Sequence, residues 1–185
     1  TNGWPTPDIA AGSYFYHGEN NEVYIGFVIP LDYKNPHLSP FDEFQRWKTH
    51  PSIKKYLIGG ERLSYGARAL IKGGLQSLPK MEFPGGLLIG CNAGTLVFSK
   101  IKGSHTAMKS GEIAGKHAFD TLQNNISVDF DSKINESWIY TELYKSRNFG
   151  PIFHKFGALI GAAVNVIDQF IFRGRLPFTM SHPTP

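Results

Sequence analysis

The stretch of residues 84–111, PGGLLIGCNAGTLVFSKIKGSHTAMKSG, constrains the fold more than any other part of the sequence. Its apolar residues 87–90 predict a short buried strand, its glycines predict a turn, and residues 104 to about 124 predict a helix capped by Ser104 or Thr106. This arrangement directs backbone amides and the positive end of a helix toward one point. It indicates a site for an anionic or electron-rich group, although a plain buried strand followed by a packing helix fits the same spacing.

The predicted helix has a face of small side chains, which lets a backbone or a flat ligand approach it closely. These residues are Ala107, Gly111, Ala114, Gly115 and Ala118. A flavin ring is one electron-rich group that suits such a surface. The amides around residues 105–107 would then point at its pyrimidine edge, where negative charge grows on reduction.

The remaining segments predict short strands and helices, so we expect an α+β fold with a mixed sheet. Residues 13–17 and 23–31 favour a hairpin, and residues 62–70 favour a further strand. A helix should begin at Pro40 with Ser39 as its cap and end before Pro51, followed by a helical turn over 52–57. Residues 131–147 predict one helix with three side chains turned inward, Trp138, Leu143 and Tyr144.

Composition argues against disulfide-rich, self-contained iron-sulfur and nucleic-acid-binding proteins. The 185 residues suit one domain or part of a larger protein, and the start at Thr1, without an initiator methionine or signal segment, indicates an internal piece. The single Cys91 cannot form a disulfide framework or a self-contained iron-sulfur site, so any cluster would lie outside this chain. The net charge of +4 comes from Lys and Arg spread along the sequence, which does not indicate nucleic-acid binding.

Residues 156–172, FGALIGAAVNVIDQFIF, are almost wholly apolar and are followed by Arg173 and Arg175. A membrane-spanning helix needs about 20 apolar residues, so this run is too short and too interrupted to predict a span. A buried helix between domains and a helix lying in one leaflet of a membrane both fit the pattern.

Five sequence blocks carry a resemblance to a known family: LDYKNPHLSPFDEFQRWKTHPSI, YGARAL, GGLQSLPK, FPGGLLIGC and KIKGSHTAMKSG. In this order and spacing they closely resemble the electron transfer flavoprotein-ubiquinone oxidoreductase family. The resemblance implies a fragment of a glutathione-reductase-like FAD-binding flavoprotein. It further implies a ubiquinone-binding portion over residues 1–80, an FAD-binding portion over 81–126 and a helical, membrane-contacting region over 127–185. A GxGxxG motif and the family's four cluster cysteines are missing from the sequence.

The resemblance also implies a function for the complete protein. It would accept electrons from electron transfer flavoprotein, pass them through a 4Fe-4S cluster and FAD, and reduce ubiquinone at a bacterial or mitochondrial inner membrane. The fragment alone is expected to be catalytically incomplete, with no catalytic residue and no metal site of its own. Two alternatives stay open: a FixC-like or geranylgeranyl-reductase-like flavin oxidoreductase, which the LSPFDEFQRWK block argues against, and a non-catalytic lipid-surface binding module.

Family motifs imply the FAD-binding residues Gly90, Cys91, Gly94, Gly103, Ser104, His105, Thr106 and Ala107. Cys91 is interpreted as a small buried thiol without a redox duty. Thr106 either donates a hydrogen bond to the flavin or caps the helix, and His105 is either a proton donor for quinone reduction or a structural residue.

The family's quinone-binding Gly-Gly pair corresponds to Ala11 and Gly12. A methyl group therefore projects at residue 11, where backbone should approach a flat ring, while Gly12 keeps the backbone N–H expected to donate a hydrogen bond. With the resemblance, insertion into one leaflet is favoured for the apolar run. The membrane-contacting residues are then Phe153, Phe156, Leu159, Ile160, Val164, Ile167, Phe170 and Ile171.

Overall fold

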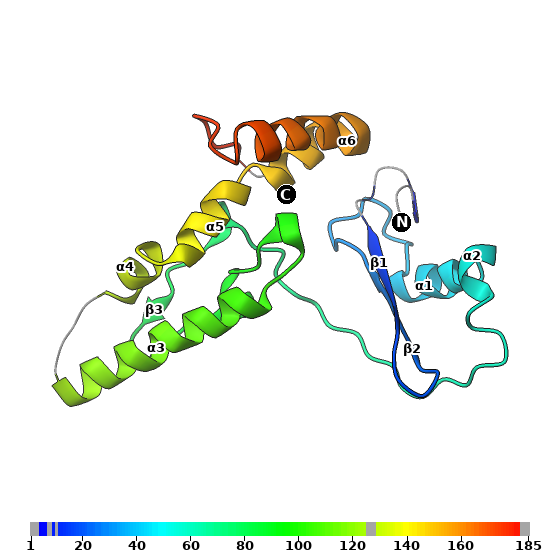
Figure 1. Cartoon of the computed structure of the whole chain (residues 1–185), viewed down its shortest axis with the longest axis horizontal. Coiled ribbons are helices and arrows are strands. Elements are labelled where there is room, and N and C mark those ends of the chain that lie inside the picture. The colour runs from blue at the N-terminus through cyan, green and yellow to red at the C-terminus, as the bar shows by residue number, and fades with distance from the viewer. Residues whose placement is uncertain (1–3, 7–8, 10, 125–128, 182–185) are drawn as a thin grey trace. The chain divides into compact units, whose positions relative to one another are not determined.

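The computed structural model describes residues 4–6, 9, 11–124 and 129–181, and the chain divides between Ala67 and Arg68 into two compact units (Figure 1). Each unit combines helices with a two-stranded antiparallel sheet. The expected α+β class is therefore confirmed. In the part of the chain that is described, both sheets are antiparallel, where a mixed sheet was expected.

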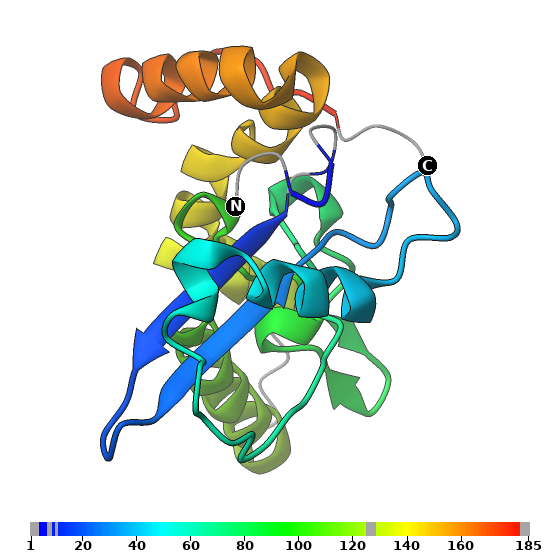
Figure 2. The same ribbon diagram turned by 90° about the vertical axis from the view of Figure 1, so that its right-hand side faces the viewer.

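The first unit is built on a hairpin of β1 (Gly12–His17) and β2 (Val23–Val28), which confirms the predicted pair of strands. Asn20 and Asn21 both have positive φ, as a tight hairpin turn requires. One face of the hairpin packs on helices, because Phe27 stacks on Phe44 and Phe15 meets Tyr56. Figure 2 shows these helices crossing the two strands.

The helices of this unit are α1 (Pro40–Lys48) and α2 (Pro51–Lys54). The predicted start of α1 is confirmed, since the Ser39 hydroxyl accepts a hydrogen bond from the Asp42 amide at 3.3 Å. Trp47 is its buried residue. The helical turn expected over 52–57 is shorter than predicted. The strand expected over 62–70 is wrong: residues 61–70 are exposed and irregular, because no strand of the described residues pairs with them.

The second unit contains α3 (Ser104–Asn124), α4 (Phe130–Asn135), α5 (Trp138–Ser146) and α6 (Phe149–Val166), with a hairpin of β3 (Glu82–Phe83) and β4 (Gly86–Leu87). Short turns η1 (Leu75–Ser77), η2 (Gly90–Ala93) and η3 (Phe98–Lys100) and a π-helix η4 (Ile167–Ile171) complete it. Helices α4 and α5 pack along α3 (Figure 1). The core between these elements consists of Met81, Ala93, Val97, Ala114, Phe130, Ile134, Ile139 and Leu143.

Two predictions for this unit need correction. The single helix expected over 131–147 is two helices, because the Ser137 hydroxyl accepts from the Ile139 amide and starts a new one. Of the three side chains expected to face inward, Leu143 is fully buried, but Trp138 is 43% and Tyr144 is 39% exposed. The strand expected over 87–90 stops at Leu87, and Gly90 begins η2 instead with a φ of 65°.

Helix α6 begins seven residues before the expected start of the apolar run, and Gly157 interrupts it with a φ of 71°. No helix of the described residues is long and apolar enough to cross a membrane.

Candidate functional site

The turn at Gly90 lies directly against the first turns of α3. The Gly90 amide donates to the Ser110 hydroxyl at 2.9 Å, and this hydroxyl donates in turn to the Ala107 carbonyl at 2.9 Å. A Cβ atom at position 90 would lie 3.3 Å from the Ala107 Cβ. Glycine and alanine are therefore what allow the η2 turn and the helix to approach so closely.

A second close approach joins η2 to the residue before α3. A Cβ atom at Gly103 would lie 2.5 Å from the Cys91 Sγ, so the half-buried thiol fills the space that a side chain at 103 would need. The Gly94 amide closes the turn by donating to the Cys91 carbonyl at 3.0 Å, and its own carbonyl accepts from the Gly74 amide at 3.3 Å. The structure thus brings the residues expected to bind FAD together at one place.

Helix α3 begins at Ser104, so Gly103 holds the N-cap position and the expected capping by Ser104 or Thr106 is wrong. Thr106 is buried inside the first turn, where its hydroxyl donates to the Gly103 carbonyl at 2.9 Å. The amides of the first helical turn have no carbonyl ahead of them within the helix. Because Ser104 is exposed, this end of α3 is accessible to an anionic group.

The side chain of His105 points to α5. Its Nε2 lies 2.7 Å from a carboxylate oxygen of Glu142, and its ring is parallel to that of Trp138 at a centroid distance of 5.6 Å. The Lys100 ammonium donates to the other Glu142 oxygen at 2.6 Å. Burial raises the pKa of Glu142, but hydrogen bonds and charges from Lys100 and His105 outweigh it, so this pKa lies below its ordinary value.

Sequence reasoning missed Glu142 and misplaced Trp138. The two residues are four apart on α5, a spacing that places both on one face of the helix. The presence of an indole and a carboxylate on one face of α5 is the sequence signal that could have predicted a polar partner for this face.

The residues expected to bind ubiquinone lie in the first unit. The Ala11 amide donates to the Ile9 carbonyl at 2.9 Å, and Gly12 opens β1 opposite Val28. A Cβ atom at Gly12 would meet no atom within 4 Å, so the backbone there is open to a ligand. Tyr14 projects from the same face of the strand and is 46% exposed.

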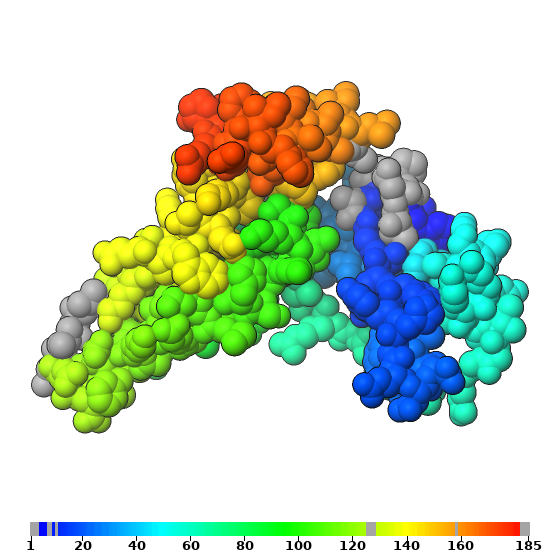
Figure 3. Space-filling model, viewed as in Figure 1, coloured from blue at the N-terminus to red at the C-terminus, as the bar shows by residue number. Residues whose placement is uncertain are grey.

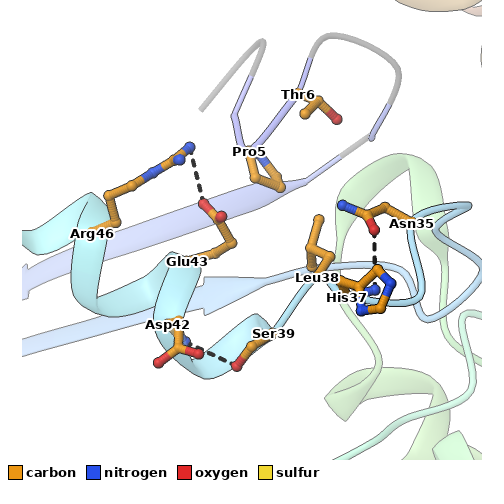
Figure 4. Close-up of a pocket in the computed structure, with 9 residues that line it drawn as sticks. All are labelled: Pro5, Thr6, Asn35, His37, Leu38, Ser39, Asp42, Glu43 and Arg46. Carbon is orange, nitrogen blue, oxygen red and sulfur yellow. Dashed lines mark hydrogen bonds and ion pairs between the residues drawn. The ribbon is translucent and has the colours of Figure 1, made fainter.

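A pocket of about 310 Å³ in the first unit lies beside the start of α1 (Figure 4). Its lining residues are Pro5, Thr6, Asn35, His37, Leu38, Ser39, Asp42, Glu43 and Arg46. Polar groups in it pair with one another, as Glu43 does with Arg46 at 3.1 Å. Neither Ala11 nor Gly12 contributes to this pocket, and we assign no ligand to it.

The polarity of α6 and η4 is inverted relative to that of a typical surface helix. Six of the eight residues expected to contact a membrane are exposed, namely Phe156, Leu159, Ile160, Ile167, Phe170 and Ile171, and Figure 3 shows this segment in orange and red at the surface. Phe153 and Val164 are half-buried. The polar side chains of Asn165 and Asp168 are buried instead, at 3% and 1% exposure. We refer to the six exposed residues as the apolar face.

Metal ligation was not expected of this chain. Across the described ranges, no group of three or more His, Cys, Asp or Glu side chains is placed to hold a metal ion.

Comparisons with known proteins match the whole chain. Residues 1–70, nearly the extent of the first unit, match the family model described as "ETF-QO, ubiquinone-binding". The chain is 55% identical over its full length to the electron transfer flavoprotein-ubiquinone oxidoreductase of Pseudomonas aeruginosa, of which it covers 35%. Mitochondrial proteins of that name are 45% identical in Oryza sativa, over 100% of the chain, and 48% in Bos taurus, over 98%; the chain covers 32% of each. It therefore spans about one third of the length of these curated relatives.

Proposed function

The chain belongs to the electron transfer flavoprotein-ubiquinone oxidoreductase family, and we propose that it forms part of the FAD and ubiquinone sites of such an enzyme. The complete protein takes electrons from electron transfer flavoprotein, passes them through a 4Fe-4S cluster and FAD, and reduces ubiquinone. The ligands of the cluster lie outside this chain. Identity of 55% over all of the chain is the observation that carries the proposal.

The FAD portion of the proposal places the flavin at the start of α3. The residues fit such a group, because Ser104 is exposed and the amides of the first turn of α3 have no carbonyl ahead of them within the helix. When bound, FAD supplies the electron-carrying ring. The amides of Ser104 and His105 would bind its pyrimidine edge and stabilise the negative charge of the reduced ring. In this arrangement residues 81–126 belong to the FAD-binding domain of a glutathione-reductase-like parent fold.

The ubiquinone portion of the proposal lies within residues 1–80. The family model that matches residues 1–70 is a ubiquinone-binding one, and Gly12 presents open backbone on β1. We propose that the quinone ring lies against this open backbone at Gly12. The Ala11 methyl group limits how closely the ring approaches, so Ala11→Gly in the complete protein should lower KM for ubiquinone with little change in kcat. An unchanged KM would separate residue 11 from the quinone site.

A membrane surface completes the proposal, with residues 127–185 as the contacting region. The apolar face of α6 and η4 would enter one leaflet, while Arg173 and Arg175 stay with lipid headgroups. For the complete enzyme, we propose a bacterial or mitochondrial inner membrane as the location.

Reconstitution of the complete protein tests the function. We expect a flavin absorption spectrum, reduction of that flavin by reduced electron transfer flavoprotein, and reduction of a ubiquinone analogue in liposomes. A protein that binds liposomes but carries no flavin would instead be a lipid-surface module, the alternative that the exposed apolar face favours. A flavin that electron transfer flavoprotein does not reduce would indicate another flavin oxidoreductase.

A further inference from the structure

Three elements of the second unit converge on one carboxylate beside the start of α3. Lys100 comes from η3, His105 from the first turn of α3 and Glu142 from the middle of α5. One oxygen of Glu142 accepts from Lys100 at 2.6 Å, and the other lies 2.7 Å from the His105 ring. Both oxygens of this side chain are therefore engaged, and its 25% exposure leaves it partly shielded from water.

We propose that Glu142 is a positioning residue for the α3 N-terminus, where it fixes His105 and sets the charge next to the proposed flavin. This inference rests on the proposed FAD site. Trp138 supports it, because its ring is within 6° of parallel to the imidazole and holds that plane against α5. With Nε2 directed to Glu142 and one face on the indole, His105 is held away from the helix end, which leaves the first-turn amides clear.

The charges of the cluster follow from these contacts. Lys100 and His105 are the charged or titratable groups that face Glu142 from η3 and α3. Lys100 and Glu142 carry opposite charges, and they form an ion pair at 2.6 Å. Reduction places negative charge on a flavin, so a nearby positive charge raises its potential and a negative charge lowers it. The negative charge of Glu142 therefore lowers the flavin potential, and the positive charge of Lys100 raises it.

Redox titration of the flavin in the complete protein, with all variants compared at the same pH, tests this. Glu142→Gln keeps a hydrogen-bonding side chain but removes the negative charge, so we expect the midpoint potential to rise. Lys100→Met removes a positive charge, so we expect the potential to fall. The matched control is Glu112→Gln, because Glu112 also bridges two cations on α3, Lys109 and Lys116, but lies farther along the helix. It should leave the potential unchanged.

Shifts of the same sign in the Glu142 and Lys100 variants, or shifts no larger than that of Glu112→Gln, would overturn the inference. Loss of flavin from Glu142→Gln leaves Lys100→Met as the deciding variant, since the exposed Lys100 side chain tolerates replacement. A wild-type protein without flavin would defeat the proposed function itself, whereas bound flavin with an unmoved potential defeats this inference alone.

Discussion

The buried guanidinium of Arg147 donates to the carbonyl oxygen of Gly174 at 2.6 Å, joining residues 27 positions apart in the sequence. The same side chain donates to the Leu176 carbonyl at 2.5 Å. The neighbouring Asn148 accepts from the Met180 amide at 2.8 Å. Together, these two side chains fasten residues 174–180 to the end of α5.

Replacing Arg147 by Met should therefore destabilise the second unit. The carbonyl oxygens of Gly174 and Leu176 would then lose a buried hydrogen-bond donor. We therefore expect the free energy of unfolding to fall by about 3 kcal/mol. Urea denaturation of the chain measures this. Arg46→Met is the control, because Arg46 is exposed and pairs with Glu43 one helical turn away, a contact expected to contribute less than about 1 kcal/mol. An equal decrease in the free energy of unfolding of the two variants would contradict the assigned role of Arg147.

Gly103→Ala should destabilise the turn beside α3, because the added methyl group would lie 2.5 Å from the Cys91 Sγ. We expect a loss of about 1–3 kcal/mol, typical of overpacking. Cys91→Ala should remove the clash with the new methyl group. In a double-mutant cycle, Gly103→Ala should therefore cost about 1 kcal/mol or more less stability in the Cys91→Ala background than in wild type. Additive effects of the two substitutions would mean that the thiol and residue 103 do not compete for the same space.

Charges on the apolar face should weaken binding to liposomes. Ile160 is 62% and Phe170 is 79% exposed, so Asp at both positions should leave the fold intact while removing apolar area from the lipid contact. Co-sedimentation of the complete protein should fall at least about tenfold. Leu122→Asp, at an equally exposed position on α3, should have no effect. Undiminished binding of the double variant would exclude the apolar face as the lipid contact.

Acid should destabilise the chain partly through Glu142. Although burial raises the pKa of this carboxyl, Lys100 and His105 lower it below the reference value of 4.5. A depressed folded-state pKa means that the carboxylate stabilises the fold above about pH 4.5, and that this contribution disappears as the pH falls through the lower folded value. Urea midpoints of Glu142→Gln should accordingly differ from wild type at neutral pH and converge in acid. Glu136→Gln, at the exposed end of α4, should track wild type throughout.

Elements with strong local signals could be predicted from the sequence. Helix α1 has Ser39 and Pro40 at its start, and α3 has a long run of helix-forming residues after Gly103, so short-range interactions determine where each begins. The β1–β2 hairpin likewise follows from alternating residues around an Asn-rich turn.

Residues whose partners are distant in sequence could not be placed in the same way. Trp138 is apolar enough to predict burial, yet it lies against His105, 33 positions earlier, and is partly exposed. Strand propensity over 62–70 produced no strand, because a ladder needs a partner that the described residues do not offer.

The sequence by itself determined the family, the α+β class, the hairpin, and the helices that begin at Pro40 and Ser104, because these depend on local propensity and on ordered blocks of residues. Only the tertiary structure decided that Glu142 joins Lys100 to His105, that Arg147 holds the segment after Gly174, and that α6 buries Asn165 while exposing Leu159. These features depend on contacts between residues that are tens of positions apart in the sequence. Hydrogen bonds and burial at such contacts outweigh the preferences of single residues, so local patterns do not reveal them.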